Sequence, residues 1–236
     1  MKKYIIVGLL SLFFMNGFSQ DLNFEVRGKY QRPVKKEKLQ EARFVSDFVP
    51  GYPASWVSQY VSVEILVTSN GNTQKAVNEN DLLSTAQKNL LNKAEPSSDI
   101  VIKVFYKHKN AVTGKMGINQ MHILLTVVPE KEAEYIGGYA ELKKYLKVNS
   151  INKMAEPSIF GRLPTVAANQ QAKVLFTINE QGEIINAKIS QTSGSKRTDQ
   201  LMLDAIHKMP KWKPAENAKG IKVKQEFEFI VGNGGC

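Results

Sequence analysis

Residues 172–190 read AKVLFTINEQGEIINAKIS, and this stretch decides the fold of the last third of the chain. Apolar residues recur at every second position before Glu180, which is the period of a half-buried strand. In the central Glu180-Gln181-Gly182, the glycine tolerates the positive φ that a tight hairpin turn needs. The stretch therefore predicts a β-hairpin with one face on a core.

A helix and a last strand follow this hairpin. Thr198 is the predicted N-cap, Asp199 suits the positive end of the helix, and Pro210 ends it. The apolar residues between these limits share one helical face, namely Leu201, Met202, Ala205, Ile206 and Met209. Residues 221–230 alternate again and predict one long strand. The order strand, strand, helix, strand predicts an α+β domain over residues 171–232.

Residues 60–130 predict a second small α+β domain. Alternation over 61–68 with Asn70-Gly71 predicts a hairpin. Ser84 with Gln87 fits a capping box that starts a helix, and two apolar strands follow at 100–106 and 121–128. The two domains share their layout, either through an old duplication or because this is a common α+β arrangement.

The remaining segments carry weaker patterns. Residues 21–59 are charged and rich in turn residues, so we expect an irregular segment. Residues 131–170 are expected to be a linker with a short helix at 139–146.

Residues 1–20 have the layout of a secretory signal peptide. Lys2 and Lys3 precede an apolar run from Tyr4 to Phe14, and small or polar residues follow. We expect cleavage after Ser19 or Gln20. An uncleaved anchor stays open, because the uncharged stretch from Tyr4 to Gln20 reaches the lower limit for a membrane span.

Composition narrows the classes of partner. The chain has 32 basic and 22 acidic residues and a net charge of +10. The charge is spread, and an exported protein rarely meets nucleic acid, so we expect a solvated basic surface and no nucleic-acid partner. The single cysteine, Cys236, excludes an intrachain disulfide and leaves a thiol that is free or paired between chains.

No pattern in the sequence indicates catalysis. The three histidines (His108, His122 and His207) are not spaced as metal ligands. Gly137-Gly138 lacks the rest of a phosphate-binding motif. We therefore expect no enzyme activity, no cofactor and no metal.

The chain from about Tyr135 onward resembles the C-terminal domain of the TonB family. The resemblance rests on the hairpin, the helix, the Gly137-Gly138 lead-in and above all the hexapeptide Met209, Pro210, Lys211, Trp212, Lys213 and Pro214. Within this hexapeptide, Trp212 suits either a contact anchor for a partner or a plug between helix and sheet, and the flanking prolines favour the plug. No family is recognised for residues 60–130.

The resemblance implies partner capture by β-strand addition. TonB proteins carry energy from an inner-membrane ExbB–ExbD motor to outer-membrane receptors, whose TonB box is captured as an added strand beside the last strand of the sheet. An exposed sheet edge offers unpaired N–H and C=O groups for this pairing. The positions to which this role carries over are Ile221, Lys222, Val223, Lys224, Gln225, Glu226, Phe227, Glu228, Phe229 and Ile230.

Three functions compete at this point. The first is a periplasmic TonB-like binding module associated with TonB-dependent transport, soluble once the signal is cleaved. The second is an inner-membrane energy transducer that works with an ExbB–ExbD-type motor. Against it, Ser11 is present but Met15 stands where the family has histidine. The third is a structural or assembly protein of the cell envelope. A homodimer is compatible with each.

Overall fold

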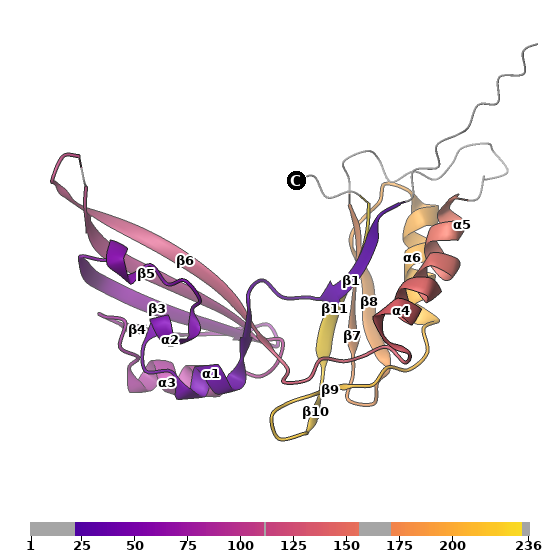
Figure 1. The fold of residues 1–236 in the computed structure, drawn as a ribbon, viewed down its shortest axis with the longest axis horizontal. Helices are drawn as coiled ribbons and strands as arrows, with labels where there is room; N and C mark the ends of the chain where they lie inside the picture. Colours follow the sequence, from indigo (N-terminus) through magenta and orange to yellow (C-terminus); the bar gives the residue numbers. More distant parts are fainter. Residues whose placement is uncertain (1–21, 111, 156–170, 233–236) are drawn as a thin grey trace, which may run out of the picture.

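The computed structural model describes residues 22–110, 112–155 and 171–232. They form two lobes, each a β-sheet with helices against it (Figure 1). The α+β class predicted from the sequence is confirmed. The expected signal peptide, Ser11, Met15 and Cys236 lie outside the described residues. Within the described ranges, no helix is long and apolar enough to cross a membrane.

The N-terminal lobe contains a five-stranded sheet in the order β2-β6-β5-β3-β4. Its strands are β2 (Pro33–Lys35), β3 (Gln59–Ser69), β4 (Asn72–Asn78), β5 (Asp99–Lys109) and β6 (Met116–Val128). Only β2 is parallel to its neighbour. Three helices and a 3-10 turn accompany the sheet: α1 (Lys36–Glu41), α2 (Val45–Phe48), η1 (Ala54–Trp56) and α3 (Thr85–Asn92).

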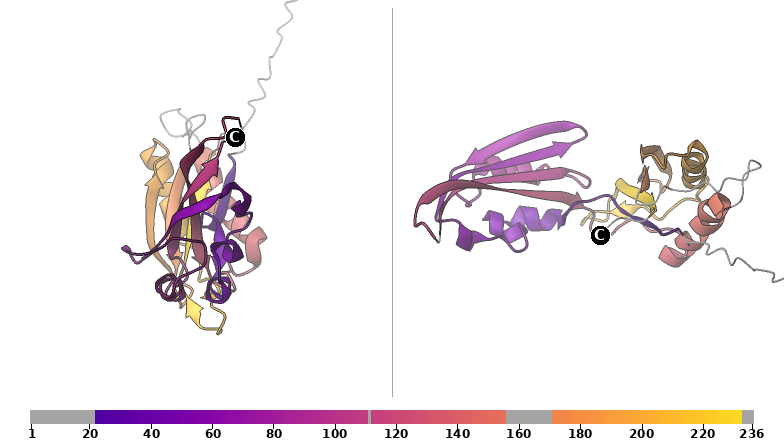
Figure 2. Two further views of the ribbon diagram at one scale, coloured as in Figure 1. Left: turned by 90° about the vertical axis from the view of Figure 1, so that its left-hand side faces the viewer. Right: turned by 90° about the horizontal axis from the view of Figure 1, so that it is seen from above.

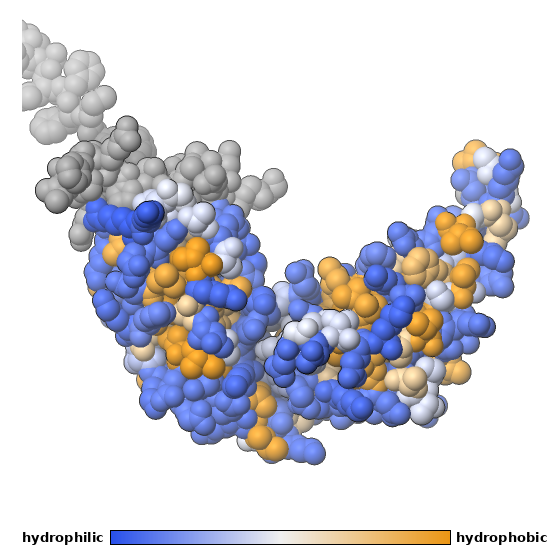
Figure 3. Space-filling view, turned by 180° about the vertical axis from the view of Figure 1, so that it is seen from behind, coloured by the Kyte–Doolittle hydropathy of each residue, from blue (hydrophilic) through white to orange (hydrophobic). Residues whose placement is uncertain are grey.

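Local sequence patterns correctly predicted the first hairpin and the start of α3 in this lobe. Asn70 and Gly71 have the positive φ values of a tight turn between β3 and β4. Ser84 and Gln87 form the predicted capping box of α3. The alternate residues of β3, β5 and β6 pack against α1–α3 in one core. On the opposite face, Leu66, Val101 and Leu124 are cross-strand neighbours, and apolar patches are visible among polar ones from behind (Figure 3).

The C-terminal lobe contains a four-stranded antiparallel sheet in the order β1-β11-β7-β8. Its strands are β1 (Phe24–Gly28), β7 (Ala172–Ile178), β8 (Ile184–Gln191) and β11 (Gln225–Val231). The helices α4 (Gly138–Leu146), η2 (a π-helix, Lys147–Ile151), α5 (Asn152–Ala155) and α6 (Lys196–His207) lie along one face of the sheet (Figure 1).

The expectation that residues 21–59 are irregular is wrong. They contain β1, β2, α1, α2 and η1. Leu39, Val45 and Phe48 are buried in the N-terminal core, and Val26 is buried in the C-terminal core. The segment therefore runs through both lobes (Figure 2) and supplies apolar side chains to both cores. The burial of these side chains stabilises its ordered structure despite its many charged residues.

The segment after residue 130 is also more than a linker. The expected helix at 139–146 is confirmed as α4, and the chain continues into η2 and α5. Tyr135, Leu142, Leu146 and Met154 are all buried in the C-terminal core. This stretch is an integral layer of the C-terminal lobe because its apolar side chains fill the space beside α6.

Two details at the ends of elements differ from expectation. The N-cap of α6 is Ser195, whose hydroxyl accepts a hydrogen bond from the amide of Thr198, rather than Thr198 itself. The expected single strand at 221–230 is divided. Its start belongs to β10 (Lys222–Val223), which pairs with β9 (Ala215–Glu216) in a separate hairpin, and β11 begins at Gln225.

Candidate strand-binding site

The site expected from the sequence is a strand edge, and β11 is the strand on which it depends. Phe227, Phe229 and Val231 of β11 point into the helix-covered core. Glu226 and Glu228 point to the opposite face, where their side chains keep 42% and 14% of their exposure. β11 is thus built as predicted, with one apolar face and one acidic face.

The expectation that β11 is an exposed edge is wrong. One side of β11 pairs with β7, and the other side pairs with β1 over five residues. β1 comes from the opposite end of the sequence: Lys29, directly after it, is 197 positions from its partner Glu226. Periodicity describes a strand's own faces and gives no information about such distant neighbours.

Hydrogen bonds join β1 to β11 beyond both ends of the ladder. The Lys29 amide donates to the Glu226 carbonyl at 2.9 Å, and the Gly232 amide donates to the Asn23 carbonyl at 2.9 Å. Bonded pairs alternate in an antiparallel ladder, so the backbones of Glu226, Glu228 and Ile230 face β1. The intervening residues Phe227 and Phe229 bond toward β7.

The core-facing side chains of β1 fit the same surface as β11. The Phe24 ring meets the Phe229 ring edge to face, with centroids 6.4 Å apart, and Lys143 Nζ lies 5.5 Å from the Phe24 ring centroid. Val26 is buried opposite Phe229. β1 therefore closes the core of the C-terminal lobe as well as its sheet.

Opposite charges meet on the outer face of this pair of strands. Lys29 Nζ lies 2.7 Å from a Glu226 carboxylate oxygen, and Arg27 Nε lies 3.9 Å from one of Glu228. Partial burial disfavours the Lys29 charge, but the hydrogen bond and negative charge of Glu226 outweigh it and raise the pKa of Lys29. Both acidic side chains of β11 thus have basic partners from the segment that begins with β1.

The end of the site near Gly28 has an unfilled polar position. Gln225 is 3% exposed, and its Oε1 accepts a hydrogen bond from the Ala133 amide at 2.7 Å. Its Nε2 has no partner among the described residues. A Cβ on Gly28 would lie 3.2 Å from this nitrogen and 2.6 Å from a ring carbon of Tyr30 in the same segment. Glycine therefore fits at this position of β1 without movement of either side chain.

The outer strand on the other side, β8, is poorly shaped for strand addition. Its pairing with β7 has two register shifts, and Asn186 has a positive φ of 56°. Such irregularities twist an edge and interrupt its row of hydrogen-bonding groups. The β11 side is thus the better platform for an added strand.

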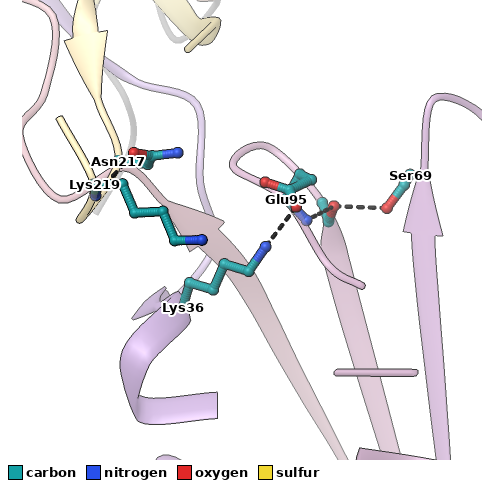
Figure 4. A network of polar contacts seen from close by, with 6 residues as sticks. Lys36, Ser69, Glu95, Asn217 and Lys219 are labelled. Carbon is teal, nitrogen blue, oxygen red and sulfur yellow. Dashed lines mark hydrogen bonds and ion pairs between the residues drawn. The ribbon is translucent and has the colours of Figure 1, made fainter. Parts of the chain in front are cut away.

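The other residues predicted for the edge lie away from β1. Val223 pairs with Ala215 in the β9–β10 hairpin. Ile221 is exposed and lines a cavity between the two lobes together with Asn217 and Lys219. Across that cavity Lys36 Nζ lies 2.5 Å from Glu95, which is in turn bonded to Ser98 and through it to Ser69 (Figure 4).

Of the hexapeptide 209–214, Met209 and Trp212 are buried in the C-terminal core. Trp212 is buried, with its ring centroid 5.1 Å from that of Phe227 and 5.6 Å from that of Tyr135. Its amide donates to the Gly182 carbonyl at 2.7 Å. Lys211 and Lys213 point outward and pair with Glu183 and Glu134. The plug interpretation of Trp212 is confirmed, since the ring fills the space between sheet and helix layer.

Residues 168–231 match the family model for the Gram-negative bacterial TonB protein C-terminal domain. The match spans less than a third of the chain and includes β7, β8, α6 and β11. β1 and the N-terminal lobe lie outside it. No curated protein and no solved structure matches the chain.

Proposed function

We propose, on the premise that residues 168–231 form a TonB C-terminal domain, that this protein is a non-enzymatic binding module of the periplasm that works in TonB-dependent outer-membrane transport. In this proposal, the protein captures an extended segment of an outer-membrane receptor as a strand beside β11. The removal of residues 1–20 and the location in the periplasm are parts of the same proposal.

The pairing of β1 with β11 carries this proposal. It supports the idea that this side of the sheet takes a strand that is distant in sequence and holds it by backbone bonds and alternate side chains. Each such bond contributes about 0.5–1.5 kcal/mol net. A receptor segment of matching length gains the same contacts when it lies in the position of β1.

The test is the binding of TonB-box peptides from the host's outer-membrane receptors to the full chain. In the Glu228→Pro variant, β11 loses a backbone donor that faces the added strand but keeps those that face β7. Glu228→Ala is the matched control, because it removes the same carboxylate and keeps the amide. Because the Glu228 backbone also bonds to β1, both variants are made in a chain whose β1 is weakened by Glu25→Pro, and there we expect Glu228→Pro to lose at least tenfold in peptide affinity.

Peptide binding that is equal in the proline and alanine variants, with both folded by circular dichroism, would contradict strand addition at β11. The link to TonB-dependent transport would be contradicted if no receptor peptide bound either the unmodified chain or the variants with a weakened β1.

A further inference from the structure

The position beside β11 is already filled by the protein's own strand. In the N-terminal lobe the order β4-β3-β5-β6 follows the same plan as β8-β7-β11-β1 in the C-terminal lobe. β6 follows β5 directly along the chain and is fixed there by a hairpin. β1 fills the equivalent place in the C-terminal lobe from the opposite end of the sequence, and a tether of only four residues, 29–32, joins it to β2.

β1 also shows which side chains this position accepts. Three residues of β1 face the core, and they are aromatic, aliphatic and glycine in that order. Phe24 packs on Phe229, Val26 is buried, and Gly28 lies beside Gln225. The residues that face Glu228 and Glu226 are Arg27 and Lys29. The position thus accepts a strand of two alternating patterns. The core-facing residues are apolar, apolar and small in order, and the last two residues of the outer face are basic.

From these contacts we infer that β1 is a built-in competitor for the β11 site and that the partner is an extended basic segment of the same pattern, antiparallel to β11. This inference rests on the strand capture proposed above and specifies its regulation and its partner. Binding then requires β1 to detach, and the two carboxylates of β11 select the incoming segment by charge.

Competition follows from the tether. A strand attached through four residues is present at its site at an effective concentration on the order of millimolar or higher. A free segment binds only those molecules in which β1 is detached. Its apparent affinity is therefore its intrinsic affinity multiplied by the fraction of molecules with β1 detached. A change that weakens β1 without altering β11 must therefore raise the affinity for a free segment.

The test uses a synthetic peptide of residues 22–30, LNFEVRGKY, and the full chain. Glu25→Pro removes a β1 amide that bonds to Ile230, whereas Glu25→Ala removes the same side chain and keeps that amide. We expect the peptide to bind Glu25→Pro at least tenfold more tightly than either Glu25→Ala or the unmodified chain. The double variant Arg27→Glu/Lys29→Glu weakens β1 by charge and provides a second route to the same result.

Charge selection is tested with the same peptide carrying glutamate at the positions of Arg27 and Lys29. We expect this reversed peptide to bind Glu25→Pro at least tenfold more weakly than the original. Adding Glu226→Lys and Glu228→Lys to Glu25→Pro should reverse the preference, because the charges then match again.

Equal peptide affinity for Glu25→Pro and Glu25→Ala, or no binding to any variant, would overturn the competitor role. Equal affinity for both peptides would overturn charge selection. These outcomes are separate from the proposed transport function. If receptor segments fail to bind while LNFEVRGKY follows the expected pattern, the transport link fails and the inference stands.

Discussion

Gly182 shows how one residue connects the turn of the C-terminal hairpin to the hexapeptide. Its φ is +77°, and a Cβ there would lie 2.0 Å from the backbone oxygen of Trp212. Gly220 has a similar φ of +72° with nothing within 4 Å of a Cβ. The two glycines share the backbone requirement, and only Gly182 has the close approach as well.

We expect Gly220→Ala to lower the free energy of unfolding by about 1–2 kcal/mol, the cost of a side chain at positive φ. Gly182→Ala should cost about 1–3 kcal/mol more, because the Trp212 backbone must move. Denaturant melts of both variants measure the difference. Equal losses would contradict the tight approach of the turn to Trp212.

Among the elements, those with local signals were the predictable ones. Asn70-Gly71 indicated the β3–β4 hairpin, and Ser84 with Gln87 indicated the start of α3. β1 had only five alternating residues, Phe24–Gly28, in a segment dominated by charges. Its position depends on pairing with a strand at the other end of the chain, and no local pattern reports such pairing.

The candidate site was predictable to the same extent. The alternation of 225–231 gave the faces of β11 correctly, including the outward Glu226 and Glu228. The neighbour on its second side, and the break between β10 and β11 at Lys224, depend on tertiary pairing and on the Asn217–Gly220 turn.

Amide hydrogen exchange tests the register of β1. Glu25 and Arg27 occupy bonded positions opposite Ile230 and Glu228, whereas the Val26 amide points away from β11. We expect the amides of Glu25 and Arg27 to exchange more slowly than that of Val26, and Glu25→Pro to abolish the protection of Arg27. Equal exchange at all three positions in the unmodified chain would contradict the pairing.

At the scale of the whole molecule, the part of the chain that the structure describes crosses between the lobes twice, and one crossing is the connection after β1. The first runs from β1 in the C-terminal sheet to β2 in the N-terminal sheet (Figure 2). The second runs from β6 to Lys131, whose backbone bonds to Glu216. When β1 is released, the second crossing is left to fix the relative orientation of the two lobes.

We therefore expect Glu25→Pro to increase the radius of gyration in small-angle X-ray scattering, since the lobes then move about one connection. Glu25→Ala should scatter like the unmodified chain. An unchanged radius in the proline variant, together with rapid exchange of β1 amides, would show that β1 does not control the relation of the lobes.

Locking β1 to β11 tests the central claim most directly. Phe24 and Val231 are opposite each other at a position without backbone bonds between them, where Cα atoms in such a pair are about 4.5 Å apart and a disulfide fits. In a Phe24→Cys/Val231→Cys/Cys236→Ser chain, capture of a TonB-box peptide can be measured before and after reduction. We predict no capture by the oxidised protein and restored capture on reduction, because the segment must take the place of β1. Equal capture in both states would contradict the account.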